Sequence, residues 1–295
     1  PVVAVLSLGD MATVHAALEV ARPQAYSLFS DLSAVAIISL MAWGLGYFGQ
    51  PHILVRFMAA DSVKSIPNAR RIGMVWMILC LGGAVAAGFF GIAYFQIHPE
   101  LAVTVNQNSE TVFMELTKIL FNPWIAGIVL AAILAAVMST LSCQLLVCSS
   151  TLTEDFYKAF IRKNASQKEL VWVGRLMVLL IAVLAIALAS NPESQVLGLV
   201  AYAWAGFGAA FGPLILLSLF WKRMNLAGAL AGMIVGAVVV ILWKNIPVFA
   251  DTKIYEIIPG FISAMIAIIV FSLITRAPEQ DVIDRFEEAD RAYKD

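Results

Sequence analysis

Charged residues are scarce in this chain. Asp, Glu, Lys and Arg make up 13% of its 295 residues, against about 25% in a typical soluble domain. None of them lies well inside a long apolar segment. A proton relay or a hydrolytic site within a membrane would need such residues at depth. Their scarcity argues against both, and we expect no enzymatic activity.

Cysteine is also rare. Cys80, Cys143 and Cys148 lie in apolar segments and lack the spacing of a metal site, which indicates inert thiols. Alternating apolar and polar residues, the pattern of membrane barrel strands, are missing as well. The net charge is −1, and residues of both signs share the same loops. Charge therefore indicates no particular partner, and no nucleic acid is expected.

Apolar residues are abundant instead. They make up 61% of the chain, and the mean hydropathy is +0.87, far above that of soluble domains. A helix that crosses a lipid bilayer needs about 20 mostly apolar residues. The sequence therefore predicts an all-α, polytopic membrane helical bundle with seven spans, at residues 32–60, 72–97, 121–150, 170–190, 196–221, 226–244 and 255–275.

Two short regions flank the predicted transmembrane domain, which covers residues 32–275. Residues 1–31 are expected to hold the end of a preceding apolar helix and then a polar external loop over 9–31. Further helices are therefore expected upstream. Residues 276–295 are expected to form a helical cytoplasmic tail.

Lys and Arg residues lie mostly on one side of the predicted membrane. Fifteen of the 19 lie on the side that the chain reaches at the end of the first, third, fifth and seventh spans. The positive-inside rule then places the C-terminus in the cytoplasm. On the opposite side, the longest connection is predicted to carry a short helix over 109–120, capped by Ser109.

Small residues mark the helices that are expected to pack closely. They occur in three spans, as Gly82, Gly83 and Gly88 in the second, Gly206, Gly208 and Gly212 in the fifth, and Gly228, Gly232 and Gly236 in the sixth. We expect these glycines to serve helix packing and assign them no chemical role.

The first predicted span contains residues that disfavour a continuous helix, namely Gly44, Gly46, Gly49 and Pro51. In a helix interior, Gly costs about 1 kcal/mol and Pro about 3 kcal/mol relative to Ala. Secondary transporters bind substrate at such breaks, where freed backbone groups line a cavity. The alternative is a Pro-kinked helix that its neighbours pack against.

Aromatic and polar side chains surround this predicted break. Trp43 and Tyr47, four residues apart, can share a face, and their rings and polar tips suit the enclosure of a small zwitterion. Gln50 and His52 add hydrogen-bond donors beside Pro51, although His52 is equally compatible with a core position. The candidate substrate residues are therefore Trp43, Tyr47, Gln50 and Pro51.

A second anomaly lies about halfway along the third predicted span. Ser139 and Thr140 follow Ala136 by three and four residues, so their hydroxyls project toward its carbonyl. Neutral oxygens that converge in this way suit a small monovalent cation, with further oxygens required from another helix. The alternative is that these hydroxyls bond back to carbonyls of their own helix.

The stretch from Arg223 to Gly236 resembles the second signature of the sodium:solute symporter family. It has a basic residue, four further residues, a Gly-Ala pair, and then small and aliphatic residues that end at another Gly. The residues that match the family's sodium ligands on its eighth core helix are Ala136, Ser139 and Thr140. The residues that match the broken sixth core helix of the members that transport proline are Trp43, Tyr47 and Pro51.

This resemblance implies the inverted five-plus-five helix fold that bacterial leucine transporters share. The chain would supply a stub of core helix five, core helices six to ten, and two C-terminal helices. Core helix one, which completes the sodium and substrate sites in the family, is expected outside this chain. The resemblance further implies a sodium-coupled symporter of the bacterial inner membrane that imports a small amino acid, L-proline first.

Three other functions compete with symport. A symporter-like domain can sense solute as a module of a larger signalling protein, and the short tail argues against this. A passive channel is disfavoured because no span carries a repeated polar stripe. A purely structural bundle is disfavoured by the two anomalies within predicted spans.

Overall fold

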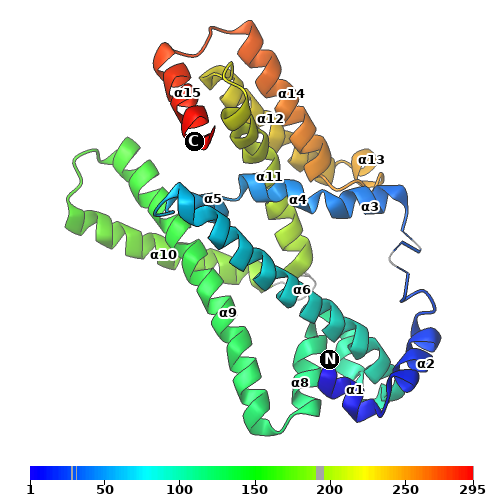
Figure 1. Cartoon of the computed structure of the whole chain (residues 1–295). Helices are drawn as coiled ribbons and strands as arrows, with labels where there is room; N and C mark the ends of the chain where they lie inside the picture. Colours follow the sequence, from blue (N-terminus) through cyan, green and yellow to red (C-terminus); the bar gives the residue numbers. More distant parts are fainter. Residues whose placement is uncertain (28, 31, 191–195, 295) are drawn as a thin grey trace. The chain divides into compact units, whose positions relative to one another are not determined.

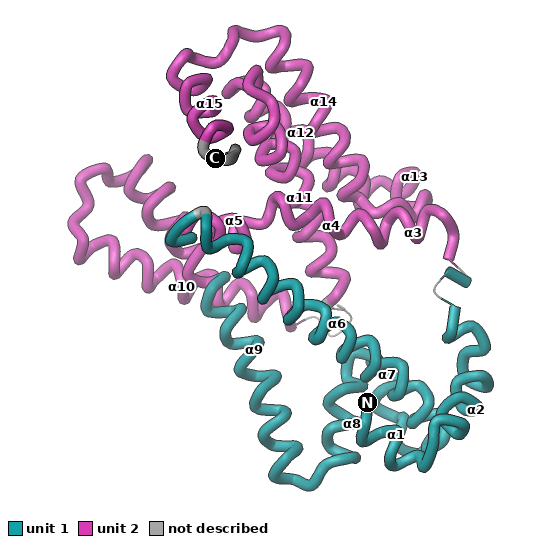
Figure 2. Tube along the Cα trace, in the orientation of Figure 1, with its two compact units in different colours: residues 1–30, 60–144 teal, residues 31–59, 145–295 magenta. Residues whose placement is uncertain are grey.

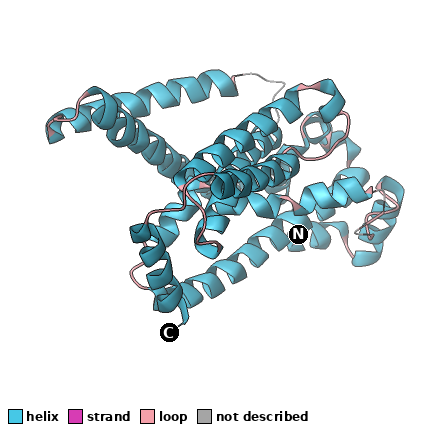
Figure 3. Cartoon of the chain, turned by 90° about the horizontal axis from the view of Figure 1, so that it is seen from above, coloured by secondary structure: helices cyan, strands magenta, loops and turns pink. Residues whose placement is uncertain are grey.

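The computed structural model describes residues 1–27, 29–30, 32–190 and 196–294. Every regular element within them is a helix, as Figure 3 shows, which confirms the predicted all-α class. Residues 28 and 31 of the predicted external loop and Asp295 of the predicted tail lie outside the described residues.

Six helices are long and apolar enough to cross a membrane, and they account for six of the seven predicted spans. They are α6 (Ile66–Ile97), α9 (Pro123–Ser150) with its wider-turned continuation η5 (Thr151–Ile161), α10 (Gln167–Ala189), α11 (Val196–Phe220), α12 (Leu226–Asn245) and α14 (Ile257–Ile274). The remaining predicted span, 32–60, is a bent pair of helices that qualifies only when the two are taken together, as a broken span or a re-entrant loop.

The chain forms two compact units, which Figure 2 colours separately. Unit 1 comprises Pro1–Ser30 and Ala60–Gln144, and unit 2 comprises Asp31–Ala59 and Leu145–Asp295. The shorter helical elements of unit 1 are α1 (Val2–Leu8), α2 (Met11–Ala21), η2 (Val63–Ser65), η3 (Pro99–Leu101), α7 (Val103–Gln107), η4 (Ser109–Thr111) and α8 (Val112–Leu120). Those of unit 2 are α3 (Ala34–Met41), α4 (Trp43–Gly46), η1 (Tyr47–Gly49), α5 (Pro51–Met58), α13 (Pro247–Ala250) and α15 (Gln280–Lys294).

The core of unit 1 gathers around the second half of α6. Ala93 packs with the buried face of α2, and Tyr94 and Phe95 pack with Leu116 of α8. This apolar packing, rather than helix propensity alone, holds the short helices in place.

The external loop predicted over residues 9–31 contains the helix α2, so its predicted conformation is wrong there. Asp10 caps this helix, because its carboxylate accepts a hydrogen bond from the Thr13 backbone N–H at 2.8 Å. Val14 and Leu18 are then fully buried against α6. Together α1 and α2 form a second bent pair, with an angle of 94°.

The short helix predicted over residues 109–120 is present, but its cap differs from the predicted one. The Asn108 side chain, and not that of Ser109, accepts a hydrogen bond from the Glu110 backbone N–H at 3.0 Å. A tight turn over Ser109–Thr111 precedes α8, which begins at Val112.

In unit 2, α11, α12 and α14 pack against one another (Figure 1). A Cβ added at Gly228, Gly232 or Gly236 of α12 would overlap a neighbouring helix, which confirms the close packing predicted for the sixth span. For the second span the close packing stays a prediction. Apart from their own helix, no described atom lies within 4 Å of a Cβ placed at Gly82, Gly83 or Gly88. Small residues permit a close approach but do not supply the neighbour.

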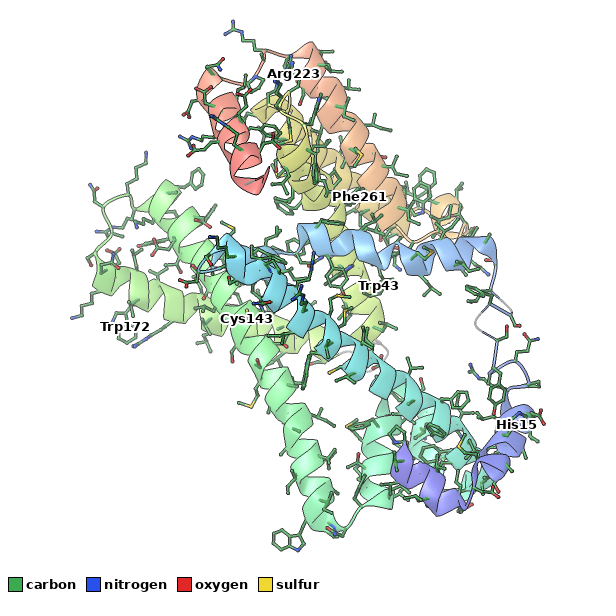
Figure 4. The ribbon with its side chains drawn as sticks, in the orientation of Figure 1. His15, Trp43, Cys143, Trp172, Arg223 and Phe261 are labelled. Atoms are coloured by element: carbon green, nitrogen blue, oxygen red, sulfur yellow. The ribbon has the colours of Figure 1, made fainter. Side chains whose placement is uncertain are left out.

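The Arg223–Gly236 stretch joins the start of α12 to the end of α14, in the region where Figure 4 labels Arg223. Asn225 accepts a hydrogen bond from the Gly228 N–H at 2.9 Å and donates to Thr275 Oγ1 at 2.7 Å. Arg223 donates to the Thr275 carbonyl at 3.0 Å. The stretch therefore caps one helix and satisfies terminal carbonyl groups of the other.

Candidate functional site

The first predicted span breaks at Gln50. Helical backbone runs from Ala34 to Gly49, Gln50 is extended with φ −82° and ψ 117°, and α5 starts at Pro51 after a bend of 49°. A residue before proline is pushed out of the helical region, whereas proline fits the first position of a new helix. The predicted break is confirmed, and its extended residue distinguishes it from a kinked continuous helix.

Two glycines let this broken helix lie directly against α11. A Cβ at Gly46 would overlap the indole ring of Trp204, and a Cβ at Gly49 would overlap the Phe207 carbonyl. From the other side, a Cβ at Gly208 would lie 2.7 Å from the Gly46 Cα. A side chain at Gly46 would displace the Trp204 ring, and one at Gly49 would push the two backbones apart.

Trp204 satisfies polar groups on both sides of the break. Its indole Nε1 donates to the Trp43 carbonyl at 2.9 Å, and its own carbonyl accepts from Gln50 Nε2 at 3.2 Å. Gln50 is only 4% exposed. Unsatisfied backbone groups in hydrocarbon cost several kcal/mol each, so these bonds make a helix break tolerable. The amide of Gln50, a predicted substrate donor, is thus engaged with α11.

An aromatic cluster surrounds the break, where Figure 4 labels Trp43. Tyr47 meets Trp204 edge to face at a centroid distance of 4.8 Å, and Trp43 stacks on Tyr255 at 5.7 Å. Trp43 also lies 6.0 Å from Trp204. Tyr47 remains 51% exposed. The structure thus brings the predicted pair Trp43 and Tyr47 together around Trp204, while Pro51 is half-buried at the start of α5.

Sequence reasoning missed Trp204 and Tyr255. One signal for Trp204 was present, because an indole N–H within an apolar helix needs an acceptor. The sequence does not say where that acceptor lies, and the Trp43 carbonyl is 161 residues away. Tyr255 lies in a loop and carried no such signal.

The predicted cation site lies on α9 in unit 1, the helix on which Figure 4 labels Cys143. Ala136, Ser139 and Thr140 are exposed, and Thr140 Oγ1 donates to the Ala136 carbonyl at 3.3 Å. Ser142 bonds back in the same way to the Met138 carbonyl at 2.7 Å. The alternative, in which the hydroxyls bond back to carbonyls of their own helix, therefore describes Thr140 and Ser142. The Thr140 bond also brings two of the three predicted sodium-ligand oxygens together, those of Thr140 and Ala136.

The donor set on α9 consists of neutral oxygens. Within the described ranges, no group of three or more His, Cys, Asp or Glu side chains could hold a metal ion. Uncharged carbonyl and hydroxyl oxygens suit a monovalent cation that must also leave.

Replacing Trp204 by Phe should destabilise the broken helix while retaining an aromatic ring. The Trp43 carbonyl would lose its donor, and an unsatisfied buried acceptor costs about 1–3 kcal/mol. We expect the free energy of unfolding, measured by denaturant titration in micelles, to fall by that amount. The matched control is Trp172→Phe, at an indole that is 62% exposed on α10, and it should have little effect. Equal losses from both substitutions would contradict a role for the Trp204 bond.

The family model named "Sodium:solute symporter family" matches residues 1–236. The chain is also similar to named transporters along nearly its whole length. It is 64% identical over 293 residues to the sodium/proline symporter of Escherichia coli K12, covering 99% of this chain and 58% of that protein. It is 51% identical over 288 residues to a high-affinity proline transporter of Bacillus subtilis, covering 98% and 60%.

A third relative, the sodium/proline symporter of Staphylococcus aureus, is 49% identical over 286 residues, which cover 94% of this chain and 55% of the relative. The chain thus spans about three fifths of the length of the curated relatives it matches. The transporter relatives and the several long apolar helices show that this chain belongs to a multi-pass membrane protein. Because the family model matches most of the sequence, the chain belongs to the sodium:solute symporter family.

Proposed function

We propose that this chain forms part of a sodium-coupled symporter that imports a small amino acid, with L-proline as the first candidate. The observation that carries the proposal is the 64% identity, over 99% of the chain, to a protein named as a sodium/proline symporter. Other relatives named for proline transport, with identities of 49–62%, support the same substrate.

In this proposal the substrate lies at the break in the first span. Trp43 and Tyr47 provide ring surface and polar tips around a small zwitterion. Gln50 and Pro51 act by holding the break, because one bonds to α11 and the other starts α5. The exposed ring of Tyr47 is available to a ligand, whereas the Gln50 amide is already bonded.

Sodium is proposed to bind at Ala136, Ser139 and Thr140. Oxygen ligands of a cation of calcium's size, close to that of sodium, lie about 2.3–2.6 Å from it, so two ligands at a right angle are about 3.3–3.7 Å apart. The separation of 3.3 Å between Thr140 Oγ1 and the Ala136 carbonyl oxygen fits this range. The remaining ligands would come from elsewhere in the protein.

The finer architecture is also a proposal. We infer the second half of an inverted five-plus-five helix fold, with α12 and α14 as the two additional helices. The transmembrane domain would cover residues 32–275, between the external region 1–31 and the tail 276–295. The positive-inside rule supports a cytoplasmic C-terminus in a bacterial plasma membrane.

Linkage between the two ligands tests this function. In a symporter each ligand tightens binding of the other by the same factor, and typical coupling energies of about 1–3 kcal/mol correspond to about 5–150-fold. Proline affinity of the complete protein in nanodiscs should therefore rise by this factor when sodium replaces potassium.

Proline affinity that is identical in sodium and potassium would contradict symport. It would favour the alternative of a solute-sensing module in a larger signalling protein. Absence of proline binding in both salts would instead contradict proline as the substrate.

A further inference from the structure

A pocket of about 300 Å³ lies in unit 2, lined by the end of α12, the last residue of α13 and the loop that leads into α14. Figure 1 labels these three helices. Its charged and polar lining residues are Trp243, Lys244, Lys253, Tyr255 and Glu256. No residue of the candidate substrate or sodium site lines it. The pocket is large enough for a small ligand, since binding pockets begin at about 300 Å³.

Glu256 supplies a buried carboxylate to this pocket. Its side chain is 9% exposed, and Lys244 Nζ lies 3.9 Å from its Oε1. That distance is too long for a hydrogen bond, which spans about 2.7–3.2 Å. Among the described residues, Lys244 is the polar group that contacts this carboxylate. A buried carboxylate is stabilised by hydrogen-bonded cationic partners, so Glu256 has capacity for a further N–H donor.

Lys253 supplies a positive charge to the pocket from a constrained turn. It has a φ of 56°, the one positive value at a residue other than glycine within the described ranges. Its backbone N–H donates to the Ala250 carbonyl at 3.1 Å, and Thr252 Oγ1 accepts from the Ile254 N–H at 3.3 Å. These bonds hold the turn that brings Lys253 into the pocket wall.

Tyr255 lies in the pocket wall and also contacts the broken helix. Its ring stacks on Trp43 at 5.7 Å, and its hydroxyl donates to the Ala201 carbonyl at 2.7 Å. A ligand in the pocket would therefore adjoin a residue that packs on the proposed substrate site.

We infer that this pocket binds a small zwitterion, with the anionic group beside Lys253 and Lys244 and the ammonium group against Glu256. A simple anion would face the buried Glu256 carboxylate, and a simple cation would face two lysines. Only a ligand of both signs complements all three groups.

Two sources can supply this chemistry. One is a free amino acid such as proline, and that identity rests on the proposed function. The other is the head group of an ethanolamine phospholipid. Trp243 lines the pocket and stacks on Phe249 at 4.8 Å, and such aromatic residues are common at the membrane interface.

Saturation-transfer NMR on the complete protein in micelles tests this inference. The buffer contains potassium and no sodium, and the probes are proline and glycerophosphoethanolamine. We expect a saturable signal from at least one probe. Glu256→Gln and Lys253→Asn, the latter chosen because Asn tolerates positive φ, should each weaken its binding at least about tenfold.

The matched control is Lys222→Gln, at a side chain of unit 2 that is 64% exposed, and it should leave the signal unchanged. Glycerophosphocholine, whose quaternary ammonium donates no hydrogen bond, should bind more weakly than glycerophosphoethanolamine. A signal from proline alone identifies a free amino acid, and one from glycerophosphoethanolamine alone identifies a lipid head group.

The inference is overturned if neither probe gives a saturable signal, or if both pocket variants bind as the unmodified protein does. Proline bound at the broken helix would produce the second result, since neither variant alters that site. If only the proposed symport is wrong, proline affinity will not depend on sodium, but the pocket variants will still weaken probe binding.

Discussion

Replacing Thr140 by Ala should raise the sodium concentration for half-maximal proline uptake roughly tenfold to a hundredfold. The substitution removes a hydroxyl that lies 3.3 Å from the Ala136 carbonyl oxygen. Losing one polar contact to a charged ligand costs about 1.5–3 kcal/mol, which corresponds to this change in affinity. Uptake into cells or proteoliposomes, measured over a range of sodium concentrations, gives the value.

The matched control for this prediction is Ser142→Ala. Ser142 lies on the same helix, is also exposed, and bonds to its own Met138 carbonyl at 2.7 Å. Its loss should leave the sodium dependence close to that of the unmodified protein, at similar protein abundance. A similar shift in both variants would point to a general effect on α9, and no shift in Thr140→Ala would refute its sodium contact.

Replacing Gly46 by Ala should weaken proline binding about fivefold to a hundredfold. The added Cβ would overlap the Trp204 ring, and forcing extra atoms into a packed contact typically costs about 1–3 kcal/mol. To relieve the overlap, Trp204 must move away from the Trp43 carbonyl, which opens the break. Equilibrium proline binding at saturating sodium measures the effect.

Gly44→Ala is the internal control, because Gly44 lies on the same short helix and no described atom lies within 4 Å of the position that an added Cβ would take. There the methyl group should be tolerated, and Ala favours a helix by about 1 kcal/mol over Gly. Proline affinity and thermal stability should therefore be retained. Equal losses at Gly44 and Gly46 would show that backbone flexibility, rather than contact with Trp204, explains the glycines.

Several features of this protein follow from local composition. Apolar content and hydropathy determine that the chain is a membrane protein and where six of its spans lie, because the bilayer acts on each segment separately. The place of the break is equally local, since Pro51 pushes Gln50 out of the helical region. The Arg223–Gly236 stretch was also recognisable in the sequence, although its role as a link between α12 and α14 was not.

Other features depend on which surfaces meet. The sequence treats Gly44 and Gly46 alike, yet only Gly46 faces Trp204. Likewise, Gly82 of α6 and Gly232 of α12 carry the same small-residue signal, but of the two only Gly232 has another helix against it within the part of the chain that the structure describes. A helical period identifies residues that share a face but does not identify the element that covers it.

The sequence by itself therefore determined that the chain lies in a lipid bilayer, that it is all-helical, where its first span breaks and to which symporter family it belongs. Only the tertiary structure decided what holds the break together, namely Trp204 and Gln50, which are 154 residues apart. It also decided that Tyr255 connects the break to a charged pocket. The physical reason is that membrane insertion and proline geometry act locally, whereas hydrogen-bond partners and packing contacts form between segments distant in the chain.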